Sequence, residues 1–144
     1  MFPNYKISTH TDDMDVDEIY AYLSVSYWAK GVPKETVKRS IENSLCFGVF
    51  HKREQIGFAR VITDSATFAY LADVYILEEH RGKGLSKWLM QKIIEHPQLQ
   101  GLRRVLLATS DAHRLYEKFG FKALANPETF MELWVPNIYT SQRD

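Results

Sequence analysis

The sequence predicts a mixed α/β domain with a sheet at its centre. Two observations lead to this fold class. Segments with helical spacing and segments with strand character alternate along the chain in the order β-α-α-β-β-β-α-β-α-β-β. Three of the strand segments also follow one another with only short polar connectors, which favours antiparallel hairpins. The length of 144 residues fits one domain, so we expect residues 1–144 to fold as a single unit.

The first third of the chain has the pattern of one strand followed by two helices. We expect a strand over residues 5–10 and a helix over residues 14–25. The apolar side chains of this helix recur at helical spacing: Val16, Ile19, Tyr20 and Leu23. Asp12 or Asp13 is the expected N-terminal cap of the helix. Pro33 suits the first turn of a second helix over the residues that follow it.

The middle of the chain contains three strand candidates in close succession. They are Leu45–His51, Ile56–Thr63 and Phe68–Leu77. The polar connectors 52–55 and 64–67 are short enough for hairpins, so we expect these three strands to pair antiparallel.

The second half of the chain returns to helices and strands in alternation. One helix has an apolar stripe formed by Leu85, Trp88, Leu89 and Ile93. Pro97 ends this helix, and Arg104–Ala108 follows as a short buried strand. A further helix carries Ala112, Leu115, Tyr116 and Phe119 on one side. It closes at Gly120, and Phe121–Leu124 and Thr129–Val135 are the expected final strands.

Composition narrows the classes of function. The 18 Lys and Arg residues balance the 18 Asp and Glu residues, so the chain lacks the basic excess of a nucleic-acid binder. Its segments are too short or too polar to span a membrane, and its first residues do not resemble a signal peptide. Cys46 is the only cysteine and lies in an apolar run, so we expect a buried thiol and no intramolecular disulfide. These features together predict a cytoplasmic protein.

The strand–helix junction Arg81-Gly82-Lys83-Gly84 is the main candidate for a ligand site. Backbone N–H groups at a helix start lack internal partners, and together with the helix dipole they favour an anion such as a phosphate. The glycines let this backbone approach a ligand closely, and Lys83 and Lys87 add positive charge. A tight turn without a ligand would use the same glycines. A dinucleotide-binding fingerprint would need a third glycine where Lys87 stands, and the pattern of a Walker loop is absent.

Two motifs in register resemble those of the GNAT acetyltransferases. Residues 81–86, RGKGLS, are similar to the family's Q/R-x-x-G-x-G/A loop, with Ser86 in place of the final Gly or Ala. Residues 112–121, AHRLYEKFGF, are similar to its A-x-x-L-Y-x-K-x-G-F helix. The order of elements matches as well, so the resemblance covers nearly the whole chain. It implies a central, mostly antiparallel sheet with helices on both faces, and an N-acetyltransferase that uses acetyl-CoA.

The resemblance also implies where acetyl-CoA binds. In the family, the strand before the loop splays from its neighbour and pairs through its free backbone groups with the pantetheine arm, while the loop cradles the pyrophosphate. The residues implied to bind the cofactor are Val74, Ile76, Arg81, Gly82, Lys83, Gly84, Ser86, Lys87 and Thr109. The N–H near Val74 would also face the acetyl carbonyl as a small oxyanion hole. Thr109 stands where many relatives have Asn.

Four residues are candidates for catalysis or acceptor binding. Tyr116 matches the family's proposed general acid, which would protonate the departing CoA thiolate; the alternative is a tyrosine packed on the inner face of its helix. Asp73 is a lone acid in an apolar strand beside the expected acetyl site, so it is our candidate base; the alternative is an aspartate satisfied by backbone or by an arginine. Tyr27 and Trp28 would line an acceptor pocket or form a hydrophobic hinge between helices. We expect no metal.

Three functions therefore remain open. The first is acetyl transfer to the primary amine of a small molecule, by direct attack in a ternary complex, and we expect this one. The second is acetylation of a protein lysine or N-terminus, and the third is a non-catalytic module that binds acyl-CoA. Retention of Tyr116 and of most of the loop motif favours an enzyme. Because relatives are often dimers, a homodimer is possible.

Overall fold

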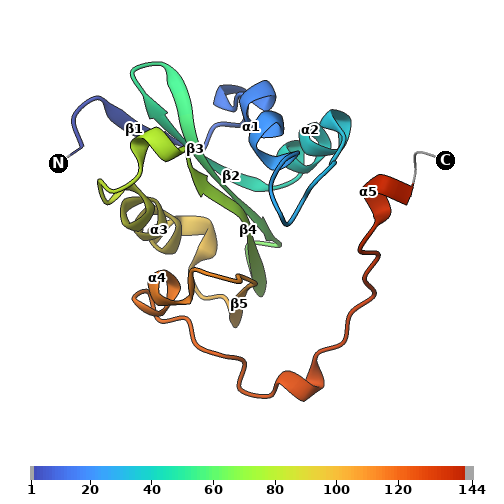
Figure 1. The fold of residues 1–144 in the computed structure, drawn as a ribbon. Coiled ribbons are helices and arrows are strands. Elements are labelled where there is room, and N and C mark those ends of the chain that lie inside the picture. Colours follow the sequence, from blue (N-terminus) through green and yellow to red (C-terminus); the bar gives the residue numbers. More distant parts are fainter. Residues whose placement is uncertain (1, 142–144) are drawn as a thin grey trace.

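The computed structural model describes residues 2–141, which form a five-stranded sheet with helices on both faces (Figure 1). The strands are β1 (Tyr5–Ser8), β2 (Leu45–His51), β3 (Glu54–Thr63), β4 (Phe68–Ile76) and β5 (Arg104–Leu107). The α-helices are α1 (Val16–Leu23), α2 (Lys34–Glu42), α3 (Leu85–Glu95), α4 (His113–Glu117) and α5 (Ile138–Ser141). The strands lie side by side in chain order; β1 to β4 pair antiparallel, and β5 runs parallel to β4. The predicted fold class, a mixed α/β domain with a mostly antiparallel sheet, is confirmed.

Two apolar layers hold the helices to the sheet. On one face, α1 and α2 bury Ile19, Val37 and Phe58. On the other face, α3 buries Leu89 against strand residues such as Ala59. Phe58 and Ala59 serve different layers because successive strand side chains point to opposite faces. Each fully buried side chain of the size of Ile or Leu contributes about 1.5–3 kcal/mol, so both layers are needed for a stable sheet.

The first helix begins later than the sequence predicts, and its cap differs. Asp15 precedes α1, and its Oδ1 accepts a hydrogen bond of 3.1 Å from the N–H of Glu18. Neither of the two predicted aspartates caps α1. Both lie in a preceding 3-10 turn, Thr11–Asp13, and Asp13 accepts a hydrogen bond from the hydroxyl of Ser8. The first residue of α1 depends on how its apolar face packs on the sheet. A local pattern therefore predicts the start of the helix only to within one or two residues.

β4 contains a bulge that the sequence did not predict. The register passes from the pair Arg60↔Ala72 to the pair Phe58↔Tyr75, so β4 has one residue more than β3 in this interval. Asp73 lies in the bulge with φ of 56°, in the left-handed region that few residues other than glycine adopt. A bulge bends its strand and re-aims its side chains. It therefore changes the course of β4 just before the strand enters the site described below.

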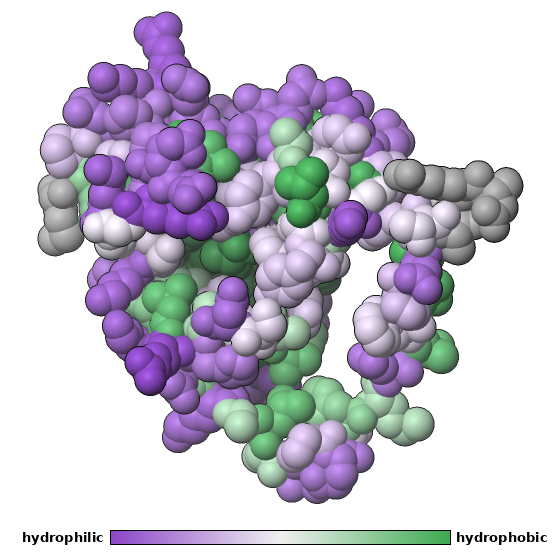
Figure 2. Space-filling view, viewed as in Figure 1, coloured by the Kyte–Doolittle hydropathy of each residue, from purple (hydrophilic) through white to green (hydrophobic). Residues whose placement is uncertain are grey.

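The predicted final strands, Phe121–Leu124 and Thr129–Val135, are wrong for the isolated chain. After α4 the chain leaves the sheet as an extended arm, residues 122–137, which leads to α5 (Figure 1). The arm passes a short 3-10 turn, Pro127–Thr129, and an open gap separates it from the body of the protein (Figure 2). A strand exists only where a neighbouring backbone completes its hydrogen bonds, and the arm passes no such neighbour here.

Candidate active site

β4 and β5 diverge and leave a cleft between them. Their pairing runs from Phe68↔Arg104 to Leu71↔Leu107 and then stops, while β4 continues to Ile76. The opening has a volume of about 1000 Å³. Its walls come from β4, from the start of α3, from the chain after β5 and from the connection between α1 and α2. A ligand that entered this cleft would lie against β4 backbone that β5 leaves unpaired.

The backbone of β4 turns two predicted residues toward this open edge. The N–H of Leu77 donates to the carbonyl of Ile56 on β3 at 2.8 Å. Because backbone groups alternate between the two edges of a strand, those of Ile76 and Val74 point to the opposite edge, where the cleft lies. The carbonyl of Ile76 indeed accepts a hydrogen bond of 2.7 Å from Nε of Arg81 on that side. Both residues also line the cleft.

The glycine loop lies at one end of the cleft and leads into α3. Gly82 and Gly84 have φ of 80° and 89°, and Gly84 directly precedes the helix. An added Cβ at Gly82 would meet no atom within 4 Å, so the backbone conformation, and not a lack of space, requires glycine there. The first helical amide that bonds back into the loop is that of Trp88, which donates to the carbonyl of Gly84 at 3.1 Å. The amides of the preceding turn lack intrahelical acceptors, which is the arrangement that binds phosphate groups. Ser86, in the same turn, lines the cleft.

Two lysines lie next to this helix start. The Lys87 ammonium beside Lys118 lowers the pKa of Lys118, since two like charges disfavour each other. An anion between them would relieve this repulsion. Lys83 is exposed in the neighbouring loop. The sequence interpretation assigned Lys83 and Lys87 to the cofactor but not Lys118, although Lys118 is the lysine of the second motif.

Tyr116 of α4 is buried and lines the cleft. Its ring meets that of Phe121 edge to face, with 5.9 Å between centroids. Burial raises the pKa of Tyr116, and Tyr27 and Asp111 nearby raise it further. The phenol is therefore protonated at neutral pH, as a proton donor must be. Tyr116 is thus packed on the inner face of its helix, which is the alternative that the sequence left open, and it also lines the cleft. Its role as a general acid stays a prediction.

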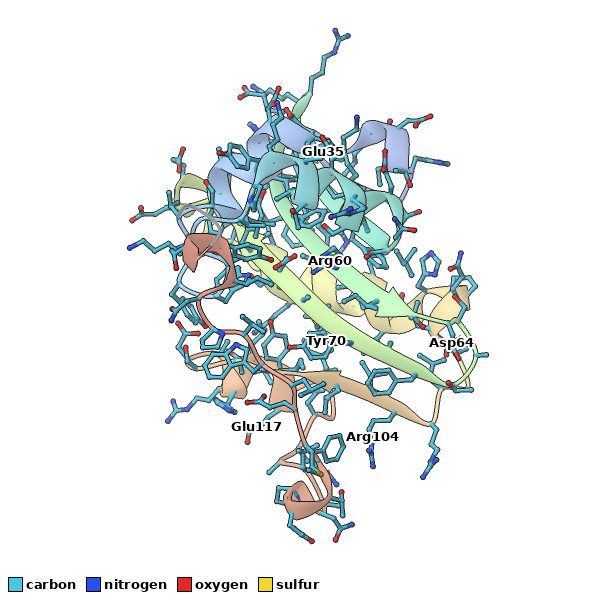
Figure 3. The ribbon with its side chains drawn as sticks, turned by 90° about the vertical axis from the view of Figure 1, so that its right-hand side faces the viewer. Glu35, Arg60, Asp64, Tyr70, Arg104 and Glu117 are labelled. Atoms are coloured by element: carbon cyan, nitrogen blue, oxygen red, sulfur yellow. The ribbon has the colours of Figure 1, made fainter. Side chains whose placement is uncertain are left out.

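Asp73 is held by two partners. One carboxylate oxygen accepts from Nε of Arg60 at 2.8 Å, and the other accepts from the indole N–H of Trp28 at 2.8 Å. The carboxylate lines the cleft, and Arg60 comes from the adjoining strand β3 (Figure 3). The pairing with an arginine is the alternative that the sequence left open. The role of Asp73 as a base stays a prediction.

Two contacts shape the mouth of the cleft. The hydroxyl of Ser110, after β5, donates to the hydroxyl of Tyr27 at 2.9 Å, which links the wall after β5 to the α1–α2 connection. Trp28 follows Tyr27 and meets its ring edge to face. Thr109 also lines the cleft, but its hydroxyl oxygen accepts from the N–H of Ala112 at 3.1 Å and so supports the start of α4. Tyr27 and Trp28 thus line the cleft and also join its two walls. Binding of an acceptor by these residues stays a prediction.

Aromatic side chains gather around the cleft more densely than sequence reasoning predicted. Those that line it are Tyr22, Tyr27, Trp28, Tyr70, Tyr75, Tyr116 and Tyr139. Tyr22 and Tyr75 stack with 3.8 Å between ring centroids, and the hydroxyl of Tyr75 donates to Glu18. Burial raises the pKa of Glu18, although the hydrogen bond from Tyr75 partly opposes this shift. No spacing in the sequence indicates that these rings meet, because they come from α1, the α1–α2 connection, β4, α4 and α5.

Comparison with known proteins shows which family the chain belongs to. The model of the Acetyltransferase (GNAT) family matches residues 12–121, which is most of the chain. The chain belongs to the GNAT family. It is therefore an acetyl-CoA-dependent N-acetyltransferase, and the resemblance stated from the two motifs is confirmed.

Individual relatives agree with this assignment. A Gibberella zeae protein named as an acetyltransferase is 38% identical, over 80% of this chain and 77% of its own. The crystal structure of a GNAT-family protein from Xanthomonas campestris pv. campestris is 50% identical and superposes with a TM-score of 0.94 over 97% of this chain and 99% of that chain. A GNAT acetyltransferase from Elizabethkingia anophelis, solved with acetyl-CoA bound, is 16% identical and shares the fold, with a TM-score of 0.66 over 93% and 90% of the two chains.

The arm has the same course in the Xanthomonas GNAT protein. A superposition over 97% of this chain includes most of residues 122–137, and a TM-score of 0.94 requires that they follow a similar path. The extended arm is thus a shared feature of two GNAT chains that differ at half of their aligned positions.

Arg81 of the GNAT loop motif was predicted to bind the cofactor, and in the structure it also makes hydrogen bonds within the protein. Its guanidinium donates to the carbonyl of Ile76 and, at 3.1 Å, to the hydroxyl of Tyr22 on α1. These bonds fix the end of β4 against α1 and so maintain the width of the cleft. Binding of the cofactor by Arg81 stays a prediction.

The described part of this GNAT chain gives no support to a thiol nucleophile, a metal site or a membrane span. Cys46 is buried, as predicted, and burial raises the pKa of its thiol to about 12, so the thiol cannot serve as a nucleophile at neutral pH. Within residues 2–141, no group of three or more His, Cys, Asp or Glu side chains is placed to hold a metal ion. None of the helices in that range is long and apolar enough to cross a membrane.

Proposed function

We propose that this GNAT enzyme transfers the acetyl group of acetyl-CoA to the primary amine of a small molecule by direct attack within a ternary complex. The observation that carries the proposal is the divergence of β4 from β5 directly beside a glycine loop and a buried tyrosine. The open edge of β4 offers backbone groups to a pantetheine arm, and the loop offers amides to a pyrophosphate. The two surfaces together would hold the CoA side of the thioester and leave the acetyl group free to meet the acceptor.

The chemistry needs three groups around the thioester carbon. The N–H of Val74 points into the cleft and would donate to the carbonyl oxygen as negative charge develops on it. The amine nitrogen attacks the carbonyl carbon, the tetrahedral intermediate collapses, and the C–S bond breaks. The departing thiolate takes a proton from the Tyr116 hydroxyl, and the amine proton leaves through Asp73 or water to solvent. The tyrosine then regains its proton from solvent.

The shape of the cleft favours a small acceptor over a polypeptide. The hydrogen bond between Ser110 and Tyr27 joins the two walls at the mouth, whereas a peptide chain would need a groove that stays open along its length. Aromatic rings line the acceptor side, and they suit an amine with an apolar or planar body. The charged side chains that line the cleft are two of each sign, Arg60 and Arg81 with Asp73 and Asp111, and Arg60 and Asp73 are paired with each other. We therefore expect acceptors whose binding depends on packing more than on net charge.

Thiol release from acetyl-CoA tests this function. We expect turnover with small aromatic or apolar amines and little with lysine-containing peptides of matched concentration. Tyr116→Phe should lower kcat by about 10²-fold or more, which is the usual size of a general-acid contribution. The affinity of this variant for acetyl-CoA, measured by calorimetry, should stay unchanged.

The matched control is Tyr20→Phe, which removes the hydroxyl of a tyrosine that packs outside the cleft. It should retain the parent rate. Equal rates for Tyr116→Phe and the parent would remove Tyr116 from the mechanism. Turnover of peptides but not of small amines would favour a protein acceptor, and acetyl-CoA binding without thiol release from any amine would indicate a binding module.

A further inference from the structure

A carboxylate on α1, Glu18, is connected to the cleft through one tyrosine. The hydroxyl of Tyr75 on β4 donates a hydrogen bond to Oε2 of Glu18. Tyr75 lines the cleft, and its side chain packs in the apolar layer under α1 and α2. The acceptor candidates Tyr27 and Trp28 lie in the connection between the same two helices. The hydrogen bond from Tyr75 to Glu18 therefore starts on the acceptor side of the cleft.

Tyr75 is the neighbour of the two β4 residues that are expected to bind the cofactor. Val74 and Ile76 flank it in the sequence, and their backbone groups point to the open edge of β4. Successive side chains of a strand point to opposite faces. The side chains of Val74 and Ile76 accordingly pack in the layer under α3, whereas that of Tyr75 packs under α1 and α2. An amine that approaches a thioester at this edge from the acceptor side therefore comes to the face of the sheet that carries Tyr75.

The ring of Tyr75 is held in one orientation. The ring of Tyr22 stacks on it, with 3.8 Å between centroids and 6° between the ring planes. The hydroxyl of Tyr22 in turn accepts a hydrogen bond of 3.1 Å from Arg81 of the glycine loop. Tyr75 itself is 4% exposed. These contacts keep its hydroxyl beside Glu18 without a search among rotamers.

Glu18 is freer to accept a proton than Asp73, the candidate base named from the sequence. Asp73 is paired with the guanidinium of Arg60, and a nearby positive charge favours the ionised form of a carboxylate. Within residues 2–141, Tyr75 is the single side chain that donates to the carboxylate of Glu18, and no Lys, Arg or His forms an ion pair with it. Burial raises the pKa of Glu18; the hydrogen bond from Tyr75 opposes this shift, and the charge of Asp15 adds to it. Glu18 therefore binds a proton more readily than a glutamate in water does.

We propose that Tyr75 and Glu18 form the relay that removes the proton from the acceptor amine. As the amine nitrogen bonds to the thioester carbon it becomes positively charged and acidic. Its proton passes to the oxygen of Tyr75 while the hydroxyl proton of Tyr75 passes to the carboxylate of Glu18. The C–S bond then breaks, and Tyr116 protonates the CoA thiolate. Glu18 releases its proton to solvent and Tyr116 regains one from solvent, so the protons balance.

The phenol of Tyr75 exchanges one proton for another and does not act as a phenolate. Burial raises its pKa, and the hydrogen bond to Glu18 adds to the shift, so the hydroxyl stays protonated at neutral pH. A hydroxyl can accept a proton through a lone pair while it donates its own. Glu18 is partly exposed and can return the proton to water. The other titratable groups that act on the pair are Tyr22 and Asp15.

The relay rests on the proposed function in one respect, which is the position of the thioester at the open edge of β4. It does not depend on the size of the acceptor, because every acceptor amine must lose a proton when the amide forms. It assigns Asp73 a structural role in its pair with Arg60.

The pH dependence of thiol release tests the relay, with whichever small amine or peptide the parent chain acetylates. Tyr75→Phe keeps the ring that stacks on Tyr22, and Glu18→Gln keeps an oxygen that accepts from the Tyr75 hydroxyl. Both variants thus remove proton transfer and preserve the packing. Each should lower kcat by about 10²-fold or more, which is the usual size of an acid–base contribution. Each should also abolish the fall in kcat that protonation of Glu18 causes in the parent as pH is lowered.

Two matched controls are available on α1. Asp17→Asn removes a charge from the exposed side of the helix, where Asp17 pairs with Lys34. Tyr20→Phe removes a hydroxyl outside the cleft. Both should retain the rate and the pH profile of the parent. Circular dichroism and calorimetric binding of acetyl-CoA, which should be unchanged in all four variants, verify that each is folded.

Several results would overturn the relay. One is a Glu18→Gln or a Tyr75→Phe variant that keeps the parent rate. Another is a loss of rate that leaves the shape of the pH profile unchanged, because a purely structural effect would do this. A third is a loss of about 10²-fold in Asp73→Asn alone, which would make Asp73 the base. These results leave the proposed function intact, whereas a parent chain that binds acetyl-CoA but acetylates no amine would contradict both proposals.

Discussion

The substitution Asp73→Asn separates the two roles that the sequence left open for this carboxylate. Asparagine keeps an oxygen for the indole N–H of Trp28, and it tolerates the left-handed φ of 56° at this position. It removes the negative charge that Arg60 faces at 2.8 Å. The experiment therefore changes one thing, the charge within the pair.

The expected loss of stability follows from how far the pair is buried. Loss of one partner from a fully buried pair costs about 3–5 kcal/mol, and a hydrogen bond to a charged group contributes about 1.5–3 kcal/mol. The side chains of Arg60 and Asp73 are 17% and 9% exposed, so water can screen part of the unpaired charge. We expect Asp73→Asn to lower the free energy of unfolding by about 2–3 kcal/mol. For a chain of this length that corresponds to a fall in Tm of roughly 6–9 °C.

Chemical denaturation of four proteins measures this effect. They are the parent, Asp73→Asn, Arg60→Met and the double variant. The double-mutant cycle should give a coupling energy of roughly 2 kcal/mol, because both single changes break the same pair. A Tm that stays the same in Asp73→Asn would refute the argument from burial.

The rates of the same four proteins test proton transfer. If the pair only shapes the cleft, Asp73→Asn and Arg60→Met should slow turnover by similar factors of less than about tenfold. If Asp73 accepts the amine proton, Asp73→Asn alone should lose about 10²-fold or more, and Arg60→Met should retain most of the rate. If both variants lost about 10²-fold in turnover rate, neither a purely structural role of the pair nor a purely catalytic role of Asp73 would explain the result.

Three further predictions concern other parts of the chain. Gly84→Ala forces a side chain into φ of 89°, so it should cost about 1–2 kcal/mol and raise the KM for acetyl-CoA, as thermal unfolding and kinetics would show; an unchanged KM would contradict the placement of the loop. The thiol of Cys46, with a pKa of about 12, should react with a disulfide reagent at pH 8 only after unfolding, and rapid reaction of the native protein would contradict its burial. Because burial raises the pKa of Glu18, the neutral form stabilises the fold below the unfolded pKa, and this contribution is lost as pH rises through the folded pKa. Glu18→Gln should therefore gain stability relative to the parent between pH 4 and pH 7 in denaturation experiments, whereas a difference that does not change with pH would contradict the shift.

Much of the fold follows from local pattern, and the prediction succeeded where that pattern is strong. The positions of α3 and of β2, β3 and β4 agree with the sequence to within two residues, because the spacing of apolar side chains specifies which face is buried. The two glycines of the loop marked its position in the sequence. The structure gives the reason: both have positive φ, which favours glycine whatever surrounds it. The position of Lys118 beside Lys87 depends on how α4 packs near the start of α3, so the sequence did not indicate it.

Other features depend on contacts between distant residues. The partner of Asp73 comes from another strand, and the bulge that holds Asp73 exists only because β3 and β4 differ in length by one residue over this interval. The aromatic lining of the cleft assembles from α1, the α1–α2 connection, β4, α4 and α5, so no local pattern indicates it.

The C-terminal segment shows most clearly what the sequence decides and what the tertiary structure decides. Alternation of apolar side chains over residues 131–135 marks a segment able to form a strand, and the sequence alone determines that capacity. Whether a strand forms depends on a second backbone at hydrogen-bonding distance, and the single chain directs the arm away from its own sheet (Figure 1). Side-chain periodicity is a local property, whereas strand pairing is a relation between two segments, and only the three-dimensional structure specifies the second.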